Sequence, residues 1–507
     1  MGGTVAAGGA AGAIATDGGG GGALDIGDSV LMLHRNPSHD GVYIQPALTL
    51  NAVGKLDVVS GFKATLPDPN DHVFAQPLFV DDGAGGTDLI IVATEANNVY
   101  ALDGATGHIV WTKNLGAPVP LTKMSCGNLD PYGVTGTPVI DFASRRVFAT
   151  AAILPASGTP TYQIFALSLV DGSISTGWPI DVPTVAVSGA TTFMAKTQGQ
   201  RGALALVGGT LYVPFGGLYG DCQPFHGWIV AVAIDAPASV KVWTTSALGG
   251  GLWAPGGIAS DGTSLFVGTG VTFSTTTWGG GDALLRFGTG AAFGAPADSF
   301  APGDWHTVLD PSDLGSGAAP VLFSLAGSTP SALALIFQKD GKAYLLDRAH
   351  LGGVGAALGA TGAGPTQYAS AYVATNEIIT VPAVYTTPTA TYVAFRTNAR
   401  GCPGGTMATA KITPGAPPTI AIAWCAGDGF GSPIVTTSDG THDAIVWLPA
   451  AESSNHLLAL NGDSGAPITF PGGATTITGM RRFNSAIAAK GKIYVASDGA
   501  VVAFGVP

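Results

Sequence analysis

Charged side chains are scarce in this 507-residue sequence, and no run of basic residues occurs in it. Lysine and arginine number 21 against 33 aspartates and glutamates, which gives a net charge of -12. A nucleic-acid-binding surface needs clustered positive charge to neutralise phosphates, so we expect no nucleic-acid partner. Long apolar runs are missing as well: no uninterrupted stretch approaches the roughly 20 residues that a membrane-spanning helix needs.

Sustained helical periodicity and metal-binding spacings are also absent. The nine histidines show no H-x-x-x-H spacing and the four cysteines no C-x-x-C spacing, which argues against a zinc site built by the protein. Glycine and proline, in contrast, are abundant at 76 and 34 residues. That composition suits many tight turns and no long helices, and it predicts an all-β chain.

A repeat with a period near fifty residues organises the sequence. Its clearest copy, at 88–116, reads as three short strands joined by tight polar turns. We therefore predict an eight-bladed β-propeller of four-stranded antiparallel blades. The predicted inner strands, in which small residues precede apolar ones at intervals of roughly 50 to 65 residues, are AQPLFV from Ala75, TGTPVI from Thr135, RGALALV from Arg201, APGGIA from Ala254, GAAPVL from Gly317, ASAYVA from Ala369, GSPIVT from Gly431 and NSAIAA from Asn484.

The two ends of the chain complete this prediction. The segment 481–507 is too short for a blade, whereas strand-like sequence from Gly41 precedes the first full one, so an N-terminal strand would close the ring. Residues 1–28 are almost entirely glycine, alanine and threonine, so we divide the chain into a disordered tether (1–28) and a single propeller (29–507). Such tethers resemble those that follow the lipid-bearing cysteine of bacterial surface lipoproteins. We expect membrane attachment only through an N-terminal lipid anchor of this kind.

The four cysteines are even in number and fall in two groups. Cys402 and Cys425 lie in one predicted blade, and Cys126 and Cys222 lie in loops of blades that are near neighbours. Two disulfides would fit an oxidising compartment, which for this chain means the periplasm, the outer-membrane surface or the exterior. Four buried thiols are the alternative.

Motifs along nearly the whole folded region carry a family resemblance. VYALDGATGHIVW at 99–111 resembles the tryptophan-docking repeat of pyrroloquinoline-quinone (PQQ) type propellers, which include quinoprotein dehydrogenases and non-enzymatic members such as an outer-membrane assembly lipoprotein. CGNLDPYGVTGTPVID, GDCQPFHGW, GGGLWAPGGIASDG, DLGSGAAPVL and KDGKAYLLDRAHLGG are similar to secreted bacterial PQQ-like repeat proteins of unassigned activity. The resemblance implies the propeller fold, and it makes a redox cofactor a hypothesis to weigh residue by residue.

Two positions match the catalytic pair of the quinoprotein dehydrogenases. Asp313 stands where the resemblance implies a general base, and Lys339 where it implies a cation that stabilises oxygen anions on a quinone. The calcium ligands do not match, because Leu218 or Tyr219 and Val271 stand where that family has an acid and an asparagine. An adjacent cysteine pair, which those enzymes use as a platform over the quinone, is missing too. We therefore expect no cofactor and no metal; PQQ with Ca²⁺ is the alternative. A purely structural role is the other interpretation of the Asp313–Lys339 pair.

One long loop is a candidate for ligand binding. GDCQPFHGW at 220–228 carries acidic, histidine and aromatic side chains, and loops on a rigid scaffold often hold function. The alternative is a disulfide-tied loop whose histidine caps a backbone carbonyl and whose Trp228 packs between blades. We predict that the ligand site is a central funnel formed by Asn128, Tyr219, Asp221, His226 and Trp253.

These expectations leave three functional hypotheses. The first is a surface-tethered, extracytoplasmic propeller that binds a protein, a small molecule or a saccharide at one face without catalysis. The second is a PQQ-dependent oxidoreductase that acts on an alcohol or sugar, with Asp313 as base and Lys339 as electrostatic stabiliser. The third, a hydrolase or lyase acting on polysaccharide, rests on fold analogy alone.

Overall fold

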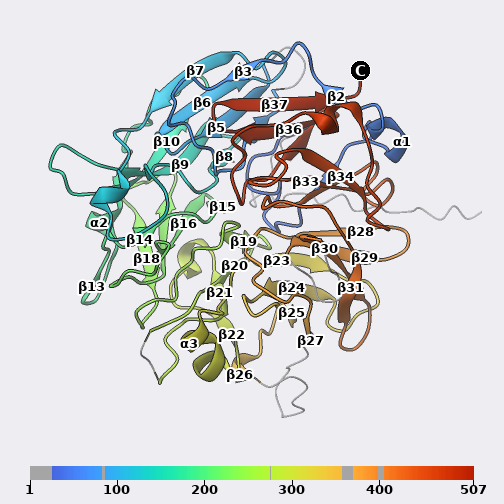
Figure 1. The fold of residues 1–507 in the computed structure, drawn as a ribbon. Helices are drawn as coiled ribbons and strands as arrows, with labels where there is room; N and C mark the ends of the chain where they lie inside the picture. The colour runs from blue at the N-terminus through green and yellow to red at the C-terminus, as the bar shows by residue number, and fades with distance from the viewer. Residues whose placement is uncertain (1–24, 83–85, 274–275, 357–368, 398–404) are drawn as a thin grey trace, which may run out of the picture.

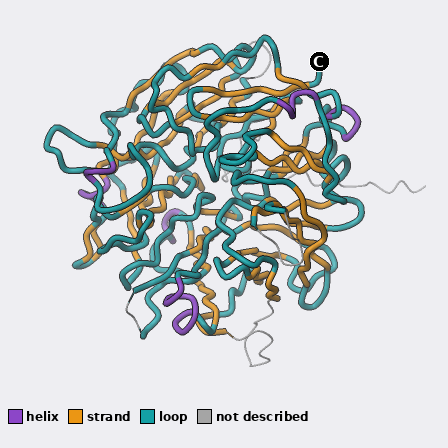
Figure 2. Tube along the Cα trace, in the orientation of Figure 1, coloured by secondary structure: helices purple, strands orange, loops and turns teal. Residues whose placement is uncertain are grey.

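The computed structural model is a ring of β-sheets. It describes residues 25–82, 86–273, 276–356, 369–397 and 405–507, in which strands far outnumber helical turns (Figure 2). The sheets stand side by side round a central axis, and within each of them consecutive strands pair antiparallel (Figure 1). This arrangement confirms the predicted eight-bladed β-propeller.

Each blade runs from an inner strand near the axis to an outer strand at the rim. Blade one comprises β4 (Leu78–Val80), β5 (Leu89–Ala93), β6 (Asn98–Asp103) and β7 (Ile109–Asn114), and blade two comprises β8 (Val139–Asp141), β9 (Arg146–Ile153), β10 (Thr161–Ser168) and β11 (Ile180–Asp181). Blade three comprises β15 (Ala205–Val207), β16 (Thr210–Gly217), β17 (Trp228–Ala233) and β18 (Val240–Thr244), with β14 (Gln198–Gly199) beside β16. Blade four comprises β19 (Ile258–Ser260), β20 (Ser264–Gly268), β21 (Leu284–Gly288) and β22 (Asp298–Pro302), with β26 (Gly353–Ala356) beside β22.

The other four blades follow the same plan. Blade five comprises β23 (Val321–Ser324), β24 (Ala332–Phe337), β25 (Lys342–Asp347) and β27 (Ala369–Tyr372), and blade six comprises β28 (Ala383–Thr386), β29 (Thr391–Arg396), β30 (Met407–Thr413) and β31 (Thr419–Ala426). Blade seven comprises β32 (Ile434–Thr437), β33 (Ile445–Pro449) and β34 (Leu457–Asn461), with β1 (Val42–Ile44) along β32. Blade eight comprises β35 (Ile487–Ala489), β36 (Lys492–Ser497) and β37 (Ala500–Gly505), with β2 (Asp57–Val58) and β3 (Ala64–Thr65) along β37.

Short elements fill the connections between strands. They are α1 (Leu50–Val53), α2 (Val182–Val185), α3 (Asp310–Ser312), η1 (Leu121–Lys123), η2 (Gly290–Ala292), η3 (Trp305–Leu309), η4 (Pro471–Ala474) and the small hairpin of β12 (Val187–Ser188) and β13 (Thr191–Thr192). Within the described ranges, no helix is long and apolar enough to cross a membrane.

The ring is closed by strands from both ends of the chain. β2 and β3 pair antiparallel with β37, the last strand of blade eight. Figure 1 shows these blue N-terminal strands beside the red C-terminal ones. The predicted closure by N-terminal sequence is confirmed, and it covers the edge that β37 would otherwise expose.

One predicted inner strand is wrong. ASAYVA, from Ala369, forms β27 and pairs with β25 as the outermost strand of blade five. The inner strand of blade six is β28, fourteen residues later in the sequence by its first residue, Ala383 against Ala369. Small and apolar residues suit any strand that packs between two sheets, so this local pattern does not separate an inner strand from an outer one.

The tryptophan-docking repeat joins neighbouring blades. Trp111, in the outer strand of blade one, donates its indole N–H to the carbonyl of Leu169 in blade two at 3.0 Å. A β-carbon on Gly172 would lie 2.7 Å from the Trp111 ring, so this turn needs glycine for space as well as for its φ of +71°. Trp424 of blade six makes the same contact with the Gly462 carbonyl of blade seven, at 3.1 Å.

The hydrophobic core lies between the blades. All five residues of β5 are buried, because each blade has a neighbouring sheet on both faces. The buried clusters span adjacent blades: one of them joins Phe148 and Tyr162 of blade two to Phe215 and Trp228 of blade three. Packing between sheets therefore continues round the ring.

A segment near the N-terminus runs through the ring, which the sequence did not predict. Residues 30–41 lie against the inner strands, whose backbone N–H groups donate to their carbonyls. The pairs, at 2.7 to 3.0 Å, are Phe79 to Val30, Ile140 to Leu31, Ser260 to Pro37, Leu322 to Ser38, Val384 to Asp40 and Val435 to Gly41. β1 then pairs parallel with β32. The segment thus satisfies inner-strand amides that would otherwise face the axis without a partner.

Of the predicted tether (1–28), the structure describes only residues 25–28. Residues 1–24 lie outside the described ranges. Asp28 is attached to the ring, because its N–H donates to the Asp81 carboxylate at 3.0 Å and its own carboxylate accepts the Lys490 N–H at 3.0 Å.

Candidate ligand-binding cavity

A cavity of about 560 Å³ opens at one end of the central channel. Some of its walls come from loops that precede inner strands, such as those that hold Trp253 and Asp313, and others from loops that follow the second strand of a blade, such as the one that holds Lys339. In an antiparallel blade these two kinds of loop lie at the same end. The cavity is therefore assembled by several blades at once.

The floor of this cavity is closed by side chains from distant blades. Arg201, before the inner strand of blade three, has its guanidinium carbon 5.2 Å from the ring centre of Phe483, which precedes the inner strand of blade eight. Both also bound a gap of only about 10 Å³, whose lining includes Leu33 of the N-terminal segment. That gap has room for about one water at most, so the cavity ends at this floor.

The predicted catalytic pair meets in the cavity. Lys339 Nζ donates to both carboxylate oxygens of Asp313, at 2.9 Å each, and lies 4.9 Å from the ring centre of Trp253. The Asp313 side chain is 57% exposed against 14% for Lys339. The ammonium is thus held between an indole face and a carboxylate that faces the cavity mouth. Asp313 adopts a left-handed φ of +52° at the end of α3.

The loop at 220–228 forms one wall and is tied down by a disulfide. Cys126 and Cys222 are bonded, which confirms a disulfide at these two predicted positions. Asp221, beside this disulfide, is half-buried, and burial together with the Asp313 carboxylate raises its pKa against the opposing effect of Lys339. The second predicted disulfide involves Cys402, which lies outside the described residues.

Four of the five predicted ligand-site residues line the cavity, and these are Asn128, Tyr219, Asp221 and Trp253. His226 is not among the lining residues. Its Nδ1 lies 3.0 Å from the Thr245 carbonyl oxygen, and Trp228 is buried in the cluster between blades two and three. These two side chains hold the loop in place, as the structural alternative for this loop expected.

Several lining residues were missed from the sequence, among them Arg201, Glu377, Arg482 and Phe483. Arg201 begins a predicted inner strand and Phe483 directly precedes one, so the repeat register was an available signal. Arg482 is paired, because its Nε and Nη2 donate to Glu452 at 2.8 and 2.6 Å.

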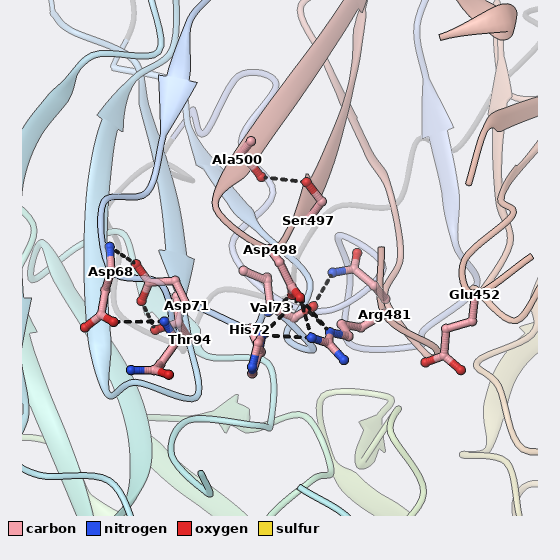
Figure 3. Close-up of polar contacts among 12 residues, drawn as sticks. Asp68, Asp71, His72, Val73, Thr94, Glu452, Arg481, Ser497, Asp498 and Ala500 are labelled. Atoms are coloured by element: carbon pink, nitrogen blue, oxygen red, sulfur yellow. Dashed lines mark hydrogen bonds and ion pairs between the residues drawn. The ribbon is translucent and has the colours of Figure 1, made fainter. Parts of the chain in front are cut away.

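A second hollow, of about 580 Å³, adjoins the cavity and shares Asn128, Tyr219 and Arg482 with it. Figure 3 shows the polar network on its far side, where Arg481 contacts both Asp498 and His72. Arg481 Nε donates to Asp498 at 2.9 and 3.0 Å, and its Nη2 lies 2.8 Å from His72 Nδ1. These contacts hold the loops of blades eight and one together beside the hollow.

One acid that borders this hollow is fully buried. Glu95 is 0% exposed; its Oε2 accepts the Gly133 N–H at 2.5 Å, and its Oε1 has no hydrogen-bond partner in the described part of the chain. Burial raises the pKa of Glu95 to about 7, against the lowering effect of hydrogen bonds from Thr135 and Gly133. Near neutral pH this carboxyl is therefore partly protonated.

Comparison with known proteins identifies the fold and not a sequence family. No protein-family model and no curated protein matches the chain. The quinohemoprotein alcohol dehydrogenase from Comamonas testosteroni aligns with a TM-score of 0.61 and 14% identity over 94% of this chain and 80% of that one. The chain has the fold of the PQQ-type propellers. ADHIIG, a quinohemoprotein alcohol dehydrogenase from Pseudomonas putida HK5, aligns with a TM-score of 0.57 and 12% identity, over the same 94% and 80%.

A third solved structure is more distant. BamB from Moraxella catarrhalis matches with a TM-score of 0.46 and 13% identity, over 89% of this chain and 97% of that one. Identities this low establish the fold alone, so the chemistry of the cavity has to be inferred from its own residues.

The lining residues do not fit the calcium-bound quinone of the PQQ-type dehydrogenases. Leu218 or Tyr219 and Val271 stand where the resemblance expects calcium ligands; Leu218 and Val271 line the cavity and are 3% and 7% exposed, whereas Tyr219 is 67% exposed. A β-carbon on Gly217 would lie 2.6 Å from the Phe225 ring, so glycine there lets a third apolar side chain complete the wall. A hard cation needs oxygen ligands, and this wall offers hydrocarbon. Among the described residues, no group of three or more His, Cys, Asp or Glu could hold a metal ion.

Proposed function

We propose that this PQQ-type propeller is an extracytoplasmic binding scaffold that takes a ligand into the cavity without catalysing a reaction on it. The observation that carries the proposal is that an apolar part of the cavity lining, formed by Leu218, Phe225 and Val271, lies where the resemblance leads us to expect calcium ligands. Its volume, about 560 Å³, lies in the range of small-molecule sites.

The Asp313–Lys339 pair supports a binding function. A general base needs a free carboxylate oxygen aimed at its substrate. Both Asp313 oxygens accept from Lys339 Nζ, so the pair neutralises itself. In this role it fixes the blade-five loop at the cavity rim and holds Lys339 over Trp253.

The disulfide supports an extracytoplasmic location, and the charges of the cavity bear on the kind of ligand. A disulfide between Cys126 and Cys222 favours an oxidising, extracytoplasmic location. The tether would carry an N-terminal lipid anchor, and the ligand would be a small molecule, a saccharide or a segment of a partner protein. Three acids and three cations line the cavity, so it has no excess of positive charge, which disfavours nucleic acid.

A PQQ-dependent oxidoreductase is the second candidate, and one observation favours it. Asp313, Lys339 and Trp253 stand together in a cavity of the fold shared with the quinohemoprotein dehydrogenases. In this alternative Asp313 would separate from Lys339 to act as base toward an alcohol or sugar, with Lys339 stabilising the anion that forms.

Calorimetric titration with PQQ and Ca²⁺, followed by a dye-linked alcohol oxidation assay, separates the two candidates. The binding scaffold predicts that Ca²⁺ does not strengthen any PQQ binding and that the wild-type protein shows no turnover. Tight binding with turnover that disappears in Asp313→Ala would overturn it in favour of the oxidoreductase.

A thermal-shift screen of saccharides and small organic acids gives the positive test of binding. A true cavity ligand should lose about five-fold or more in affinity in Trp253→Ala, since a stacked aromatic contact typically contributes about 1 kcal/mol. Val170→Ala, at a 73% exposed site that does not line the cavity, is the matched control and should bind normally. Ligands whose affinity is unchanged by both substitutions would bind elsewhere and would contradict the proposed site.

A further inference from the structure

Arg201 differs from the other cations of the cavity in having no counter-charge. Lys339 is bound to Asp313, and Arg482 is bound to Glu452. For the Arg201 guanidinium, the described residues supply neither a hydrogen bond nor an ion pair, and its specific contact is with the face of the Phe483 ring.

The position of Arg201 makes this lack of a partner costly. The side chain sits at the cavity floor, where burial lowers its pKa, and the nearby acidic groups that oppose this are Tyr132 and Glu95. Tyr132 is a neutral phenol at ordinary pH, and Glu95 is partly protonated because its pKa is raised to about 7. An arginine stays charged under these conditions. Arg201 is half-buried, and a charge partly removed from water and without a protein partner attracts an anion more strongly than a fully solvated one, so an anion brought in by a ligand would be favoured here.

Part of the lining around Arg201 is apolar. Leu218, Phe225, Trp253, Val271 and Ile379 line the same cavity, beside polar side chains. Of the three acids in the lining, Asp313 is held by Lys339, and neither Asp221 nor Glu377 makes a hydrogen bond or ion pair with Arg201. Among the described residues, the cavity therefore has one cation without a counter-ion, close to apolar side chains.

We propose that Arg201 is the anion-binding residue of this cavity and that the natural ligand is a small carboxylic acid with an apolar or aromatic body. The guanidinium would take the carboxylate through two parallel N–H···O bonds, and the body of the ligand would pack against the walls. This inference rests on the proposed binding function and specifies its ligand class. A carboxylate fits better than a phosphate because it brings one negative charge to one unpaired cation, whereas Lys339 and Arg482 are already occupied.

Titration calorimetry with three matched probes tests the ligand class. Benzoate, phenyl phosphate and benzyl alcohol share a phenyl ring and differ in the head group. We expect benzoate to bind best to the wild-type protein and to lose at least ten-fold in affinity in Arg201→Met. Arg201→Lys should retain part of the affinity, since an ammonium keeps the charge and loses the fork geometry. Arg348→Met, which removes an arginine that pairs with Asp261 and does not line the cavity, is the control and should bind benzoate within about three-fold of wild type.

Each other outcome contradicts the inference. Benzoate binding that is unchanged in Arg201→Met places the carboxylate elsewhere. Phenyl phosphate binding more tightly than benzoate, in an Arg201-dependent way, makes the carboxylate assignment wrong. No binding of benzoate or of the longer hexanoate to the wild-type protein removes the anion site altogether.

Thermal stability of the ligand-free protein gives a second test that does not depend on the probes. Arg201→Met removes an unpaired charge and keeps an apolar side chain of similar length, so its Tm should equal or exceed that of the wild type. A clearly lower Tm would mean that Arg201 is a structural residue with a protein partner, and would overturn the inference. Loss of benzoate binding alone leaves the scaffold proposal standing if a Trp253-dependent ligand is found, so the two proposals fail in distinguishable ways.

Discussion

At the residue scale, buried acids set much of the pH dependence expected of this propeller. Asp282 is 0% exposed, and burial together with the neighbouring Asp310 carboxyl raises its pKa to about 10, so it stays protonated through the physiological range. Glu95 has a pKa of about 7 and changes charge within that range. Its Oε1 lacks a hydrogen-bond partner among the described residues, which is consistent with a carboxyl that is stable in the folded protein mainly when protonated.

Glu95→Gln should flatten the pH dependence of stability between pH 5 and 8. In the unfolded chain glutamate ionises near pH 4.5, and in the folded protein near pH 7, so the folded state holds one more proton between these values. The free energy of unfolding therefore falls as pH rises from about 4.5 to 7, by roughly 3 kcal/mol in all, and is then constant. Glutamine has no charge to bury and should avoid this loss.

Urea unfolding at pH 5, 6, 7 and 8 measures this effect. The difference in the free energy of unfolding between Glu95→Gln and wild type should move in favour of the variant as pH rises. Glu377→Gln, at an exposed site, is the control and should follow the wild type. Parallel curves for Glu95→Gln and wild type would show that Glu95 is ionised in both states and would contradict the burial argument.

At the element scale, tryptophan docking between blades can be tested with two glycines that share a conformation. Gly172 and Gly158 have φ of +71° and +76°; an added β-carbon meets the Trp111 ring at Gly172 and open space at Gly158. Alanine at either site costs about 1 kcal/mol for a left-handed φ. Gly172→Ala should cost roughly 1 to 3 kcal/mol more, because the Trp111 ring must move. Equal losses in denaturant unfolding would mean that the ring yields freely and that docking contributes little.

The N-terminal segment gives the ring an acid-sensitive element. His34 is fully buried, with its Nδ1 3.3 Å from the His39 carbonyl oxygen and its Nε2 3.4 Å from Ser485 Oγ. Burial lowers the pKa of His34 to about 4 and that of His39 to about 3. In the unfolded chain both histidines take up a proton below about pH 6.5. Stability from this element is therefore present above pH 6.5 and lost as pH falls toward 4, the opposite sign to Glu95.

His34→Asn should make the protein less sensitive to acid. Asparagine tolerates the left-handed φ of +51° at this position and does not titrate. Unfolding measured from pH 6.5 down to pH 4.5 should show a smaller loss of stability for the variant than for the wild type, while both share the Glu95 contribution. His350→Asn, whose side chain is 62% exposed, should keep the wild-type slope. A wild-type slope in His34→Asn would mean that this histidine is charged in the folded protein.

Most elements with a local signature were predicted from the sequence, and most elements defined by distant partners were not. The repeat pattern predicted the blade number. The short last segment and the strand-like sequence from Gly41 predicted the closing N-terminal strand, although its partner β37 lies at the other end of the chain. The repeat pattern misplaced the inner strand of blade six, since β27 and β28 have similar small and apolar residues. Residues 30–41 carry no strand periodicity, and their partners belong to six strands spread over the chain.

The same distinction holds for the cavity. Asp313, Lys339 and Trp253 lie in recognisable motifs and were placed in the funnel, where the structure brings them together. His226 lies in an equally distinctive motif, but its ring contacts the Thr245 carbonyl, which no sequence pattern indicated. Arg201 was passed over because its importance depends on the absence of a counter-ion, which is a property of the assembled floor.

At the scale of the whole molecule, the propeller has the candidate ligand cavity at one end of its central channel, and residues 30–41 lie along the inner strands inside the channel. Arg201 and Phe483 close the cavity floor, and Leu33 of the N-terminal segment borders the narrow gap beside them. A ligand must therefore enter and leave through the same mouth, past Tyr219, which is 67% exposed at the rim. The same segment that completes the ring also helps to limit the depth of the site.

Ring closure should make residues 25–66 essential for a stable monomer. They supply the carbonyls that satisfy inner-strand amides of six blades, the parallel strand β1, and both strands that pair with β37. A chain that begins at Pro67 would leave those amides and the β37 edge unpaired, and exposed edges promote association between molecules. Size-exclusion chromatography and circular dichroism should show aggregation or loss of cooperative unfolding, whereas a chain that begins at Asp25 should behave as the full sequence does.

Adding residues 25–66 as a separate peptide should restore part of the lost stability, because the missing hydrogen bonds can form without covalent linkage. A monomeric Pro67 chain with an unchanged Tm would show that sheet-to-sheet packing alone holds the ring together.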